Sequence, residues 1–295
     1  MRIAIAGASG FIGTAVTAHL AGQGHDVLKI GRKANKSTDL VWDVAAGKLD
    51  SAALEGLDVV VHLSGENLSR GRWTRRRKRS ILQSRTDSTG LLSSTLARLD
   101  RPPKVLLVAS AVGYYGARGI ENLDETSSAG AGFLADVCRA WEAAADPARA
   151  AGIRVVHARQ GVVLGKGGAL QVMALPFKLG LGGRIGTGDQ YMPWIALADV
   201  VAAYDFLIHH DAVEGPVNFV APEQVTNREF TRALGKTLRR PTVFPLPALM
   251  ARLLFGEMAD ELLLASARVE PQVLGSAGYE FTYPRLSEAL QAALK

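Results

Sequence analysis

Three glycines spaced three residues apart lie near the start of the chain, in the stretch IAIAGASGFIGTAV. Gly7, Gly10 and Gly13 follow one apolar run and precede another, which is the order of a strand, a tight turn and a helix. In that setting one glycine permits the turn, a second lets the backbone approach a pyrophosphate, and a third lets the helix pack closely on the strand. Free amide groups at the helix start would then face the phosphates. The stretch predicts a dinucleotide phosphate site. The spacing G-x-x-G-x-x-G leaves a turn needed only for packing as the alternative.

A basic pair marks the position where the ribose of the dinucleotide is expected. An acidic residue about 20 residues beyond the glycines would bind the ribose hydroxyls of NAD, but the sequence there reads KIGRK, with Arg32 and Lys33 and no acid. A carboxylate would repel the 2′-phosphate of NADP, whereas an arginine binds it with a planar fork of donors. We therefore predict NADP(H) rather than NAD(H). The alternative is that both cations are merely solvated after a strand.

The elements that must position these residues follow from the alternation of apolar runs with helical patterns. Apolar runs such as RIAIAGA, DVVVHLSG and KVLLVASA are separated by segments of helical spacing, among them residues 74–99 and 133–151. Strands that are apolar throughout are expected where helices cover both faces of a sheet. The prediction is an α/β fold, a Rossmann-type doubly wound parallel sheet.

A smaller, mostly helical substrate lobe is expected at the carboxyl end. The sequence pattern changes after Gly165 and includes a glycine-dense loop at residues 180–188, and no linker rich in proline or serine joins the two parts. We assign residues 1–165, with later sheet segments at about 196–222, to the NADP-binding domain. Residues 166–195 and 223–295 form the predicted lobe and carboxyl extension.

Charge and composition exclude several classes of protein. The net charge is +6, but five adjacent cations at residues 75–79 account for most of it and leave a nearly neutral remainder. Consecutive positions spread around a helix, so we do not expect a nucleic-acid partner, although the run could attract an anionic substrate. No apolar run reaches the roughly 18 residues of a membrane span. With a single cysteine, Cys138, no internal disulfide can form, and we expect a cytoplasmic protein.

Metal binding and hydrolase chemistry find no support in the motifs. The six histidines show no paired spacing with carboxylates or cysteine that is typical of metal ligands, and His209 and His210 are adjacent. No G-x-S-x-G elbow is present. We therefore predict no metal site.

Longer motifs resemble the short-chain dehydrogenase/reductase superfamily in its extended, epimerase-like form. The chain is most similar to an atypical branch described as sugar-nucleotide-epimerase-like, which carries a carboxyl-terminal extension of unknown function. The stretches that carry the resemblance span nearly the whole chain: GASGFIG, VWD, HLSGENLSRGRW, ASAVGYYG, FLADVCRAWE, ARQGVVLGKGGAL, FKLGLGGRIGTGDQYMPWI, GPVNFVAPEQVTNREF and FGEMADELL.

The resemblance implies a set of contacts. Asp43 and Val44 would flank the adenine, Leu63, Ser64 and Gly65 would line the path of the ribose and pyrophosphate, and Ser110 would stand at the nicotinamide. The complete predicted set of cofactor-binding residues is Gly7, Ser9, Gly10, Phe11, Ile12, Gly13, Arg32, Asp43, Leu63, Ser64 and Gly65.

The departures from the family pattern concern catalysis. Active members use a Tyr-x-x-x-Lys pair in which the lysine makes the tyrosine a better proton donor and acceptor, yet no lysine occurs between Val105 and Gly165. The relatives' histidine after Trp194 and Ile195 is here Ala196. Tyr114 or Tyr115 could handle the proton beside Ser110, or both rings could simply pack the loop against the sheet.

Two functions remain open. One is an NADP(H)-dependent oxidoreductase or epimerase acting on a small polar substrate, in which Ser110, Tyr114 and Tyr115 are the candidate catalytic residues. The other is an NADPH-binding sensor or scaffold that has lost catalysis, which the missing lysine favours. We expect a monomer or a homodimer in either case.

Overall fold

The computed structural model describes residues 1–34, 38–69 and 71–295. Its central feature is a seven-stranded sheet in the order β10-β7-β5-β4-β1-β2-β3, in which every neighbouring pair is parallel. The strands are β1 (Arg2–Ala6), β2 (Asp26–Gly31), β3 (Leu40–Val41), β4 (Val59–His62), β5 (Val105–Ala111), β7 (Arg154–Gln160) and β10 (Gly215–Phe219). The predicted doubly wound parallel sheet is confirmed.

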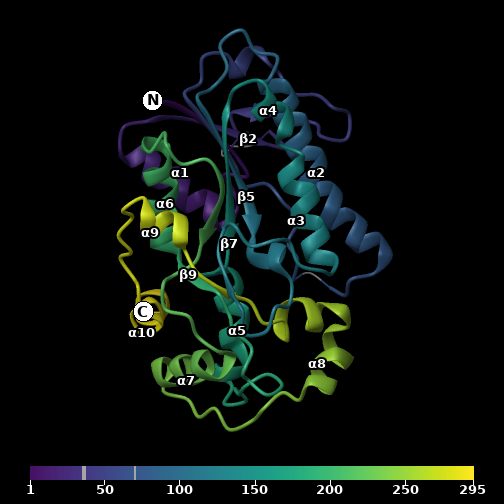
Figure 1. Ribbon diagram of the computed structural model, residues 1–295, viewed down its shortest axis with the longest axis vertical. Helices are drawn as coiled ribbons and strands as arrows, with labels where there is room; N and C mark the ends of the chain where they lie inside the picture. The colour runs from purple at the N-terminus through teal and green to yellow at the C-terminus, as the bar shows by residue number, and fades with distance from the viewer. Residues whose placement is uncertain (35–37, 70) are drawn as a thin grey trace.

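Side chains alternate between two cores because successive residues of a strand point to opposite faces of the sheet. On one face, Ile3 and Ile5 of β1 pack with α1 (Phe11–Gly22) and α6 (Leu197–His209). On the other face, Ala4 and Ala6 pack with α2 (Arg75–Leu96), α3 (Phe133–Ala143) and α4 (Asp146–Ala150). Figure 1 shows these two helical layers on either side of the sheet. Burial on both faces explains why the strands are apolar throughout.

The strand order reverses at β1 and β4. From β1 the chain winds outward to β2 and β3, and from β4 it winds the other way to β5, β7 and β10. In open parallel sheets, ligands bind at the carboxyl ends of the strands at this switch point. The glycine stretch follows β1 directly, so the fold places it there.

The predicted helix over 133–151 is two helices, α3 and α4, because of Pro147. Proline lacks an amide hydrogen, and its ring collides with the carbonyl four residues earlier, which here belongs to Ala143, the last residue of α3. The chain therefore restarts at Asp146 with Pro147 in the first turn of α4. The predicted helix over 74–99 corresponds to α2, whose amino end is capped by the Thr74 hydroxyl.

A lobe with its own core adjoins the sheet domain. It contains α5 (Gly168–Lys178), α7 (Asn227–Leu238), α10 (Leu286–Leu294) and the parallel pair β8 (Val162–Leu164) and β9 (Trp194–Ala196), whose buried side chains form one cluster around Phe230 and Leu290. α8 (Ala248–Phe255) and a short π-helix (Ala259–Leu263) complete it. Figure 1 shows α5, α7 and α8 below the sheet.

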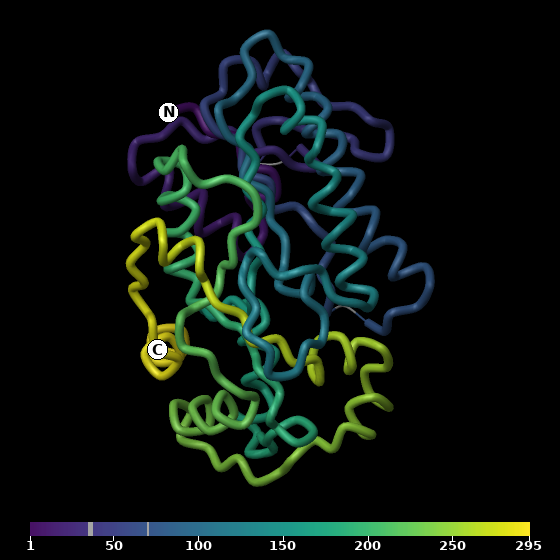
Figure 2. The backbone as a smooth tube through the Cα atoms, viewed as in Figure 1, coloured from purple at the N-terminus to yellow at the C-terminus, as the bar shows by residue number. Residues whose placement is uncertain are grey.

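The carboxyl-terminal segment returns from the lobe to the sheet domain. After a parallel pair formed by β6 (Asn122–Leu123) and β11 (Arg268–Val269), α9 (Gln272–Ser276) packs on β10, and Leu274 joins the core beside α6. Figure 2 follows this path from α8 across the molecule to the carboxyl end. Asp199 at the start of α6 fixes the segment by accepting hydrogen bonds from the amides of Thr282 and Tyr283, at 2.6 and 3.0 Å. The predicted lobe range 223–295 thus includes a segment that packs on the sheet domain.

Two short 3₁₀ turns, Ala52–Leu54 and Val112–Tyr115, complete the list of elements. Among the helices of the described residues, none combines the length and the apolar character that crossing a bilayer requires.

Candidate functional site

The first and third glycines of the loop are required by packing. Gly7 has a φ of +87°, and a Cβ atom on it would lie 2.8 Å from backbone atoms of Leu63 and Ser64, at the end of β4. A Cβ atom on Gly13 would overlap the carbonyl oxygen of Gly7. These two positions therefore bring β1, β4 and α1 into close contact, which only glycine allows.

Gly10 is different because a side chain there would require only a shift of a few tenths of an ångström in its neighbour. It is exposed, its φ of −77° suits any residue, and a Cβ atom would meet a single neighbour, the Gly7 carbonyl oxygen, at 3.3 Å. Gly10 is also the N-cap of α1, whose first turn has no side-chain cap and no acidic residue. The amides of Phe11, Ile12 and Gly13 lack partners within the helix. A missing side chain at this point leaves the amides open to an anion, so a cofactor diphosphate fits the loop.

Phe11 joins the loop to the lobe. Its ring packs closely against Gly165, Gly167 and Gly168. A Cβ atom on any of these glycines would lie only 2.8–3.2 Å from the nearest ring atom of Phe11. Gly167 and Gly168 also have φ values of +140° and +58°. Ser9 is exposed beside the ring, whereas Ile12 is half-buried against the α1 core. Of these predicted contacts, Ser9 and Phe11 present side chains at the edge of the site, and Ile12 can contribute only its amide.

Arg32 and Asp43 lie at the ends of adjacent strands. The Gly7 amide points at the Ile30 carbonyl oxygen, 3.4 Å away, and the Trp42 amide donates to the Gly31 carbonyl oxygen at 3.0 Å. The carboxyl ends of β1, β2 and β3 are therefore aligned at the same edge of the sheet. Arg32 is exposed directly beyond β2, at the carboxyl edge of the sheet.

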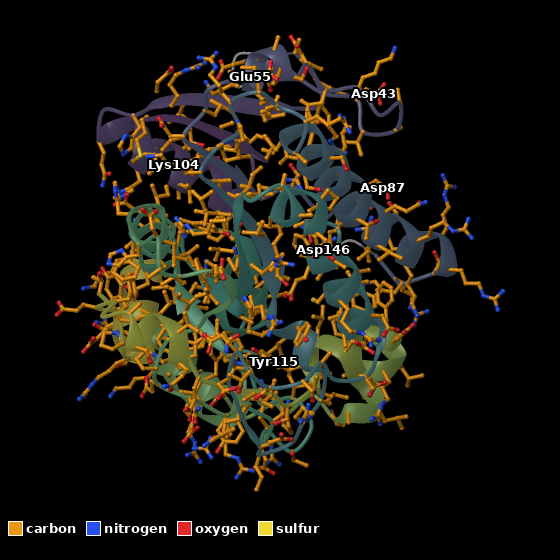
Figure 3. All side chains as sticks on the ribbon, turned by 45° about the horizontal axis from the view of Figure 1, so that its top comes forward. Asp43, Glu55, Asp87, Lys104, Tyr115 and Asp146 are labelled. Atoms are coloured by element: carbon orange, nitrogen blue, oxygen red, sulfur yellow. The ribbon has the colours of Figure 1, made fainter. Side chains whose placement is uncertain are left out.

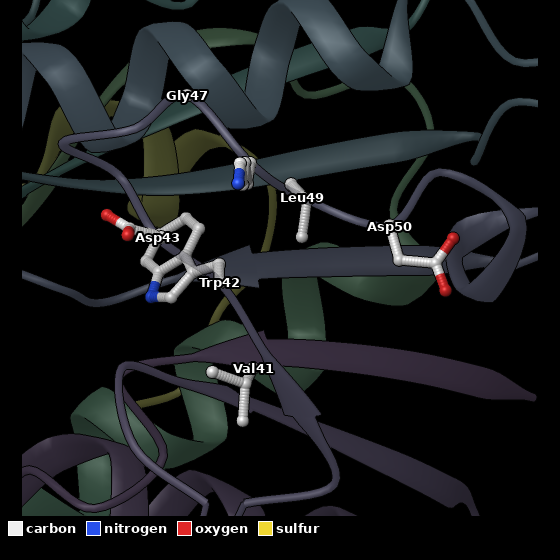
Figure 4. Close-up of a pocket in the computed structure, with 7 residues that line it drawn as sticks. Val41, Trp42, Asp43, Gly47, Leu49 and Asp50 are labelled. Atoms are coloured by element: carbon white, nitrogen blue, oxygen red, sulfur yellow. The ribbon is translucent and has the colours of Figure 1, made fainter.

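The loop after β3 forms a pocket of about 480 Å³ lined by residues 41–43 and 47–50. Asp43 pairs with Lys48 through the backbone, and one of its carboxylate oxygens accepts the Ala46 amide at 3.0 Å. Figure 4 shows the Asp43 carboxylate at the end of the pocket opposite Asp50, with the Trp42 indole beside it. The Asp43 side chain therefore shapes the loop.

Leu63, Ser64 and Gly65 continue from β4 beneath the glycine loop. The Leu63 amide donates to the Ala6 carbonyl oxygen at 2.8 Å, and Gly65 is exposed over the guanidinium of Arg85. Arg85 is itself buried, with its guanidinium 5.0 Å from the centre of the Trp141 ring. Leu63 and Ser64 therefore lie against Gly7 of the glycine loop. Arg85, which sequence reasoning missed, supports them from below.

Ser110 belongs to a buried ionic network. Its hydroxyl donates to Glu142 of α3 at 2.7 Å, and only 3% of Ser110 is exposed. Arg159 of β7 binds the same carboxylate through two nitrogens, each at 2.9 Å. Bidentate pairs of this kind are strong and directional. The hydroxyl predicted to hold a substrate is turned into the helical layer and used there, so the structure gives Ser110 a structural role.

The two tyrosines after β5 have different environments. Tyr115 is fully buried, donates to the Asn218 side chain at 2.8 Å and accepts from Arg159 at 3.0 Å. Burial raises the pKa of Tyr115 to about 12, despite the opposing effect of Arg159. Figure 3 places this residue in the interior. Tyr115 is therefore unsuited to proton transfer with a substrate, and packing explains it.

Tyr114 is half-buried, and its ring lies 3.5 Å from the guanidinium carbon of Arg159. This contact fixes the ring without occupying the hydroxyl. Of the three predicted catalytic residues, Tyr114 alone presents part of its side chain toward solvent at this end of the sheet.

The lobe contacts the start of α3, the segment in which the family's Tyr-x-x-x-Lys pair would lie. Glu261 accepts hydrogen bonds from the amides of Phe133 and Leu134 at the start of α3, both at 3.1 Å. Cys138, near the expected lysine position, is buried, and its pKa is raised to about 12 by that burial. No sequence signal identified Glu261. The charge of Arg159 within the apolar run RVVHARQ was a signal that a buried partner must exist.

Comparisons with known proteins agree with this geometry. The profile of the NAD dependent epimerase/dehydratase family matches residues 3–221, and a domain of unknown function matches residues 246–293. The chain is 46% identical over 290 residues to an epimerase family protein of Mycobacterium bovis, covering 98% of this chain and 96% of the other. It is 38% identical over 297 residues to mouse epimerase family protein SDR39U1, covering 99% of both.

A solved structure shares the whole fold. The crystal structure of human epimerase family protein SDR39U1 (isoform 2) with NADPH superposes with a TM-score of 0.90 at 35% identity, covering 99% of both chains. The NADPH in that structure agrees with the cofactor predicted here. Strand order and glycine loop define a Rossmann-type dinucleotide-binding protein. The chain belongs to the NAD dependent epimerase/dehydratase family, and the resemblance seen in its motifs is confirmed.

Proposed function

We propose that this protein binds NADP(H) along the carboxyl edge of β1, β2 and β4 and uses it to oxidise, reduce or epimerise a small polar substrate. The observation that carries the proposal is the contrast within the glycine loop. Packing requires Gly7 and Gly13, whereas Gly10 has no such requirement and leaves the first turn of α1 open. An open, uncapped helix start is suited to a diphosphate.

The residues divide the binding among themselves. The α1 amides bind the diphosphate, Arg32 binds the 2′-phosphate, and the backbone of residues 63–65 lines the path to the nicotinamide. The NADPH bound by the human relative supports this choice of cofactor. A bound nicotinamide would supply or accept the hydride. Tyr114, held by Arg159, is positioned at the same end of the sheet to hold a substrate oxygen or pass it a proton.

Binding and turnover test the proposal separately. NADPH and NADH are titrated into the protein while tryptophan fluorescence is recorded, and carbonyl compounds are then screened for consumption of NADPH at 340 nm. We expect tight binding of NADPH, weaker binding of NADH, and turnover with a polar carbonyl. Failure to bind either nucleotide would overturn the cofactor assignment.

A second candidate, an NADPH sensor or scaffold without catalysis, is favoured by the network around Glu142. There the Ser110 and Tyr115 hydroxyls are both hydrogen-bonded to other side chains of the protein. Tight NADPH binding with no consumption over a broad panel of carbonyls would support this candidate against the oxidoreductase.

A further inference from the structure

Two histidines and an aspartate from distant parts of the chain meet at the end of the molecule opposite the cofactor edge. His25 precedes β2, and Asp205 and His209 lie one turn apart on α6. One potential ligand atom from each residue lies within 4.8 Å of the other two. The three side chains therefore converge on a common point although 184 positions separate the two histidines along the chain.

Two of these atoms are buried without a hydrogen-bond partner. They are Nε2 of His25 and Oδ1 of Asp205. His209 offers Nε2 at 3.6 Å from that same Oδ1. Buried polar atoms are nearly always paired, so two orphans in one cluster indicate an unfilled partner.

The remaining polar atoms are arranged around the cluster. Oδ2 of Asp205 accepts from Gln23 at 3.0 Å and lies 3.2 Å from Nε2 of His19. Nδ1 of His25 faces the Met1 amino group at 3.4 Å, which leaves Nε2 as the nitrogen directed at the cluster. Hydrogen bonds of this kind to the second atom of a ligand fix its orientation in metal sites.

We propose that His25, Asp205 and His209 bind a zinc ion, with a water molecule as the fourth ligand. Imidazole nitrogens and a carboxylate oxygen are ordinary zinc ligands at about 2.0–2.2 Å. Tetrahedral ligands at that distance are about 3.4 Å apart. The present separation of His209 and Asp205 is already 3.6 Å, and the other separations do not exceed 4.8 Å. With zinc on Nε2, the ring proton of His25 lies on Nδ1.

The expected role of the ion is structural. The site ties the turn between α1 and β2 to the last turn of α6, at the amino ends of the strands, whereas the glycine loop lies at their carboxyl ends. Zinc bound only by the folded chain stabilises it by mass action. This proposal departs from the sequence expectation of no metal site. Sequence reasoning overlooked the Asp-x-x-x-His spacing of Asp205 and His209, and nothing in the sequence connects these residues with His25.

Calorimetry tests the site with the full chain free of any histidine tag. Zinc is titrated into chelator-treated protein, cobalt is added in parallel to read its visible absorption, and thermal unfolding is followed with zinc or with EDTA. We expect one ion per chain, the strong absorption of four-coordinate cobalt, and a rise in Tm on the order of 5 °C with zinc. Absence of stoichiometric binding would overturn the proposal.

Variants distinguish a specific zinc site from nonspecific binding of zinc at the surface. His209→Gln is suited to the test because its side chain is 54% exposed, so folding should survive. We expect it, and likewise Asp205→Asn, to weaken zinc binding at least 100-fold, beyond the 10- to 100-fold typical of outer-shell changes. His210→Gln is the matched control because Nδ1 of the adjacent His210 bonds to the Phe206 carbonyl instead. Equal zinc affinity in wild type, His209→Gln and His210→Gln would refute the site.

Discussion

The two ends of the cofactor edge differ in whether their polar groups have hydrogen-bond partners within the protein. After β1, the amides at the start of α1 have no side-chain cap, and the residue before them carries no side chain. At the carboxyl ends of β5 and β7, the polar side chains of Ser110, Tyr115 and Arg159 are all hydrogen-bonded to other parts of the protein. The first region therefore has amide groups available to a ligand, whereas the polar groups of the second mainly stabilise the folded protein.

This difference separates cofactor binding from catalysis. An open helix start keeps its affinity for an anion whatever happens elsewhere in the site. Proton transfer, in contrast, needs a side chain that reaches the substrate with a suitable pKa. The helix start of α1 meets the first requirement, whereas Ser110 and Tyr115 do not meet the second because their hydroxyls are bonded within the protein. Binding and turnover must therefore be measured separately.

The glycine loop should show the largest effect, and a matched pair of variants tests it. Gly13→Ala places a methyl group into the Gly7 carbonyl, so we expect a loss of about 4 kcal/mol or more in unfolding free energy. Gly10→Ala should lose no more than about 1 kcal/mol but bind NADPH at least tenfold more weakly. Urea unfolding and fluorescence titration measure the two effects. Wild-type NADPH affinity in Gly10→Ala would contradict the open-loop interpretation.

The closed region should be the next most sensitive. Glu142→Ala leaves the Arg159 guanidinium, whose side chain is 4% exposed, without its counter-charge. Breaking a buried pair in this way costs about 3–5 kcal/mol, measured by urea unfolding. Glu142→Gln retains an acceptor for both partners and should lose less. Similar losses in the two variants would show that the charge is unimportant.

Arg32→Ala examines the choice of cofactor at the open end. A charged hydrogen bond contributes about 1.5–3 kcal/mol, so NADPH affinity should fall roughly tenfold to a hundredfold while NADH affinity stays the same. Arg98→Ala removes an equal charge from an exposed position after α2 and serves as control. Equal losses for both nucleotides in Arg32→Ala would mean that Arg32 does not contact the 2′-phosphate.

The adjacent tyrosines should respond differently to loss of a hydroxyl. Tyr115→Phe removes hydrogen bonds with Asn218 and Arg159 and should cost about 1–2 kcal/mol of stability. Tyr114→Phe removes a hydroxyl that the interior does not use, and should change stability by less than about 0.5 kcal/mol. Denaturant midpoints of the two variants make the comparison. A larger loss in Tyr114→Phe would reverse their assigned roles.

The titration of His62 should give the smallest effect near neutral pH, and it should act through the pH dependence of stability. Burial lowers the pKa of His62 to about 3. The unfolded chain takes up this proton below about pH 6.5 while the folded chain does not, so stability falls as the pH drops from 6.5 toward 3. The contribution is about 1 kcal/mol per pH unit. Unfolding free energies at pH 6, 5 and 4 should show a shallower slope in His62→Gln, and an unchanged slope would exclude this origin.

The sequence allowed good prediction of the features that neighbouring residues encode. The apolar runs became buried strands, the glycine spacing became the turn after β1, and the helical pattern over residues 74–99 became α2. Each depends on residues only a few positions apart, so the local pattern is sufficient. Even locally, Pro147 divided one predicted helix into two.

The candidate site was less predictable because its side chains are paired over long distances. Ser110 meets Glu142 and Arg159, Glu261 caps α3, and Asp205 meets His25. Because side chains alternate along β5, Ser110 and Ala111 must face opposite sides of the sheet. The alternation alone does not determine which of these sides faces the substrate. That choice depends on which helix packs where.

By itself, the sequence determined a parallel Rossmann-type sheet with a glycine turn after its first strand, since periodicity and turn chemistry act within a few residues. Only the tertiary structure decided that two of the three candidate catalytic hydroxyls serve the interior and that a histidine and aspartate cluster forms at the other end of the sheet. The physical reason is that a buried charge or hydrogen-bonding group requires a partner, and the partner is supplied by chain packing rather than by neighbouring sequence.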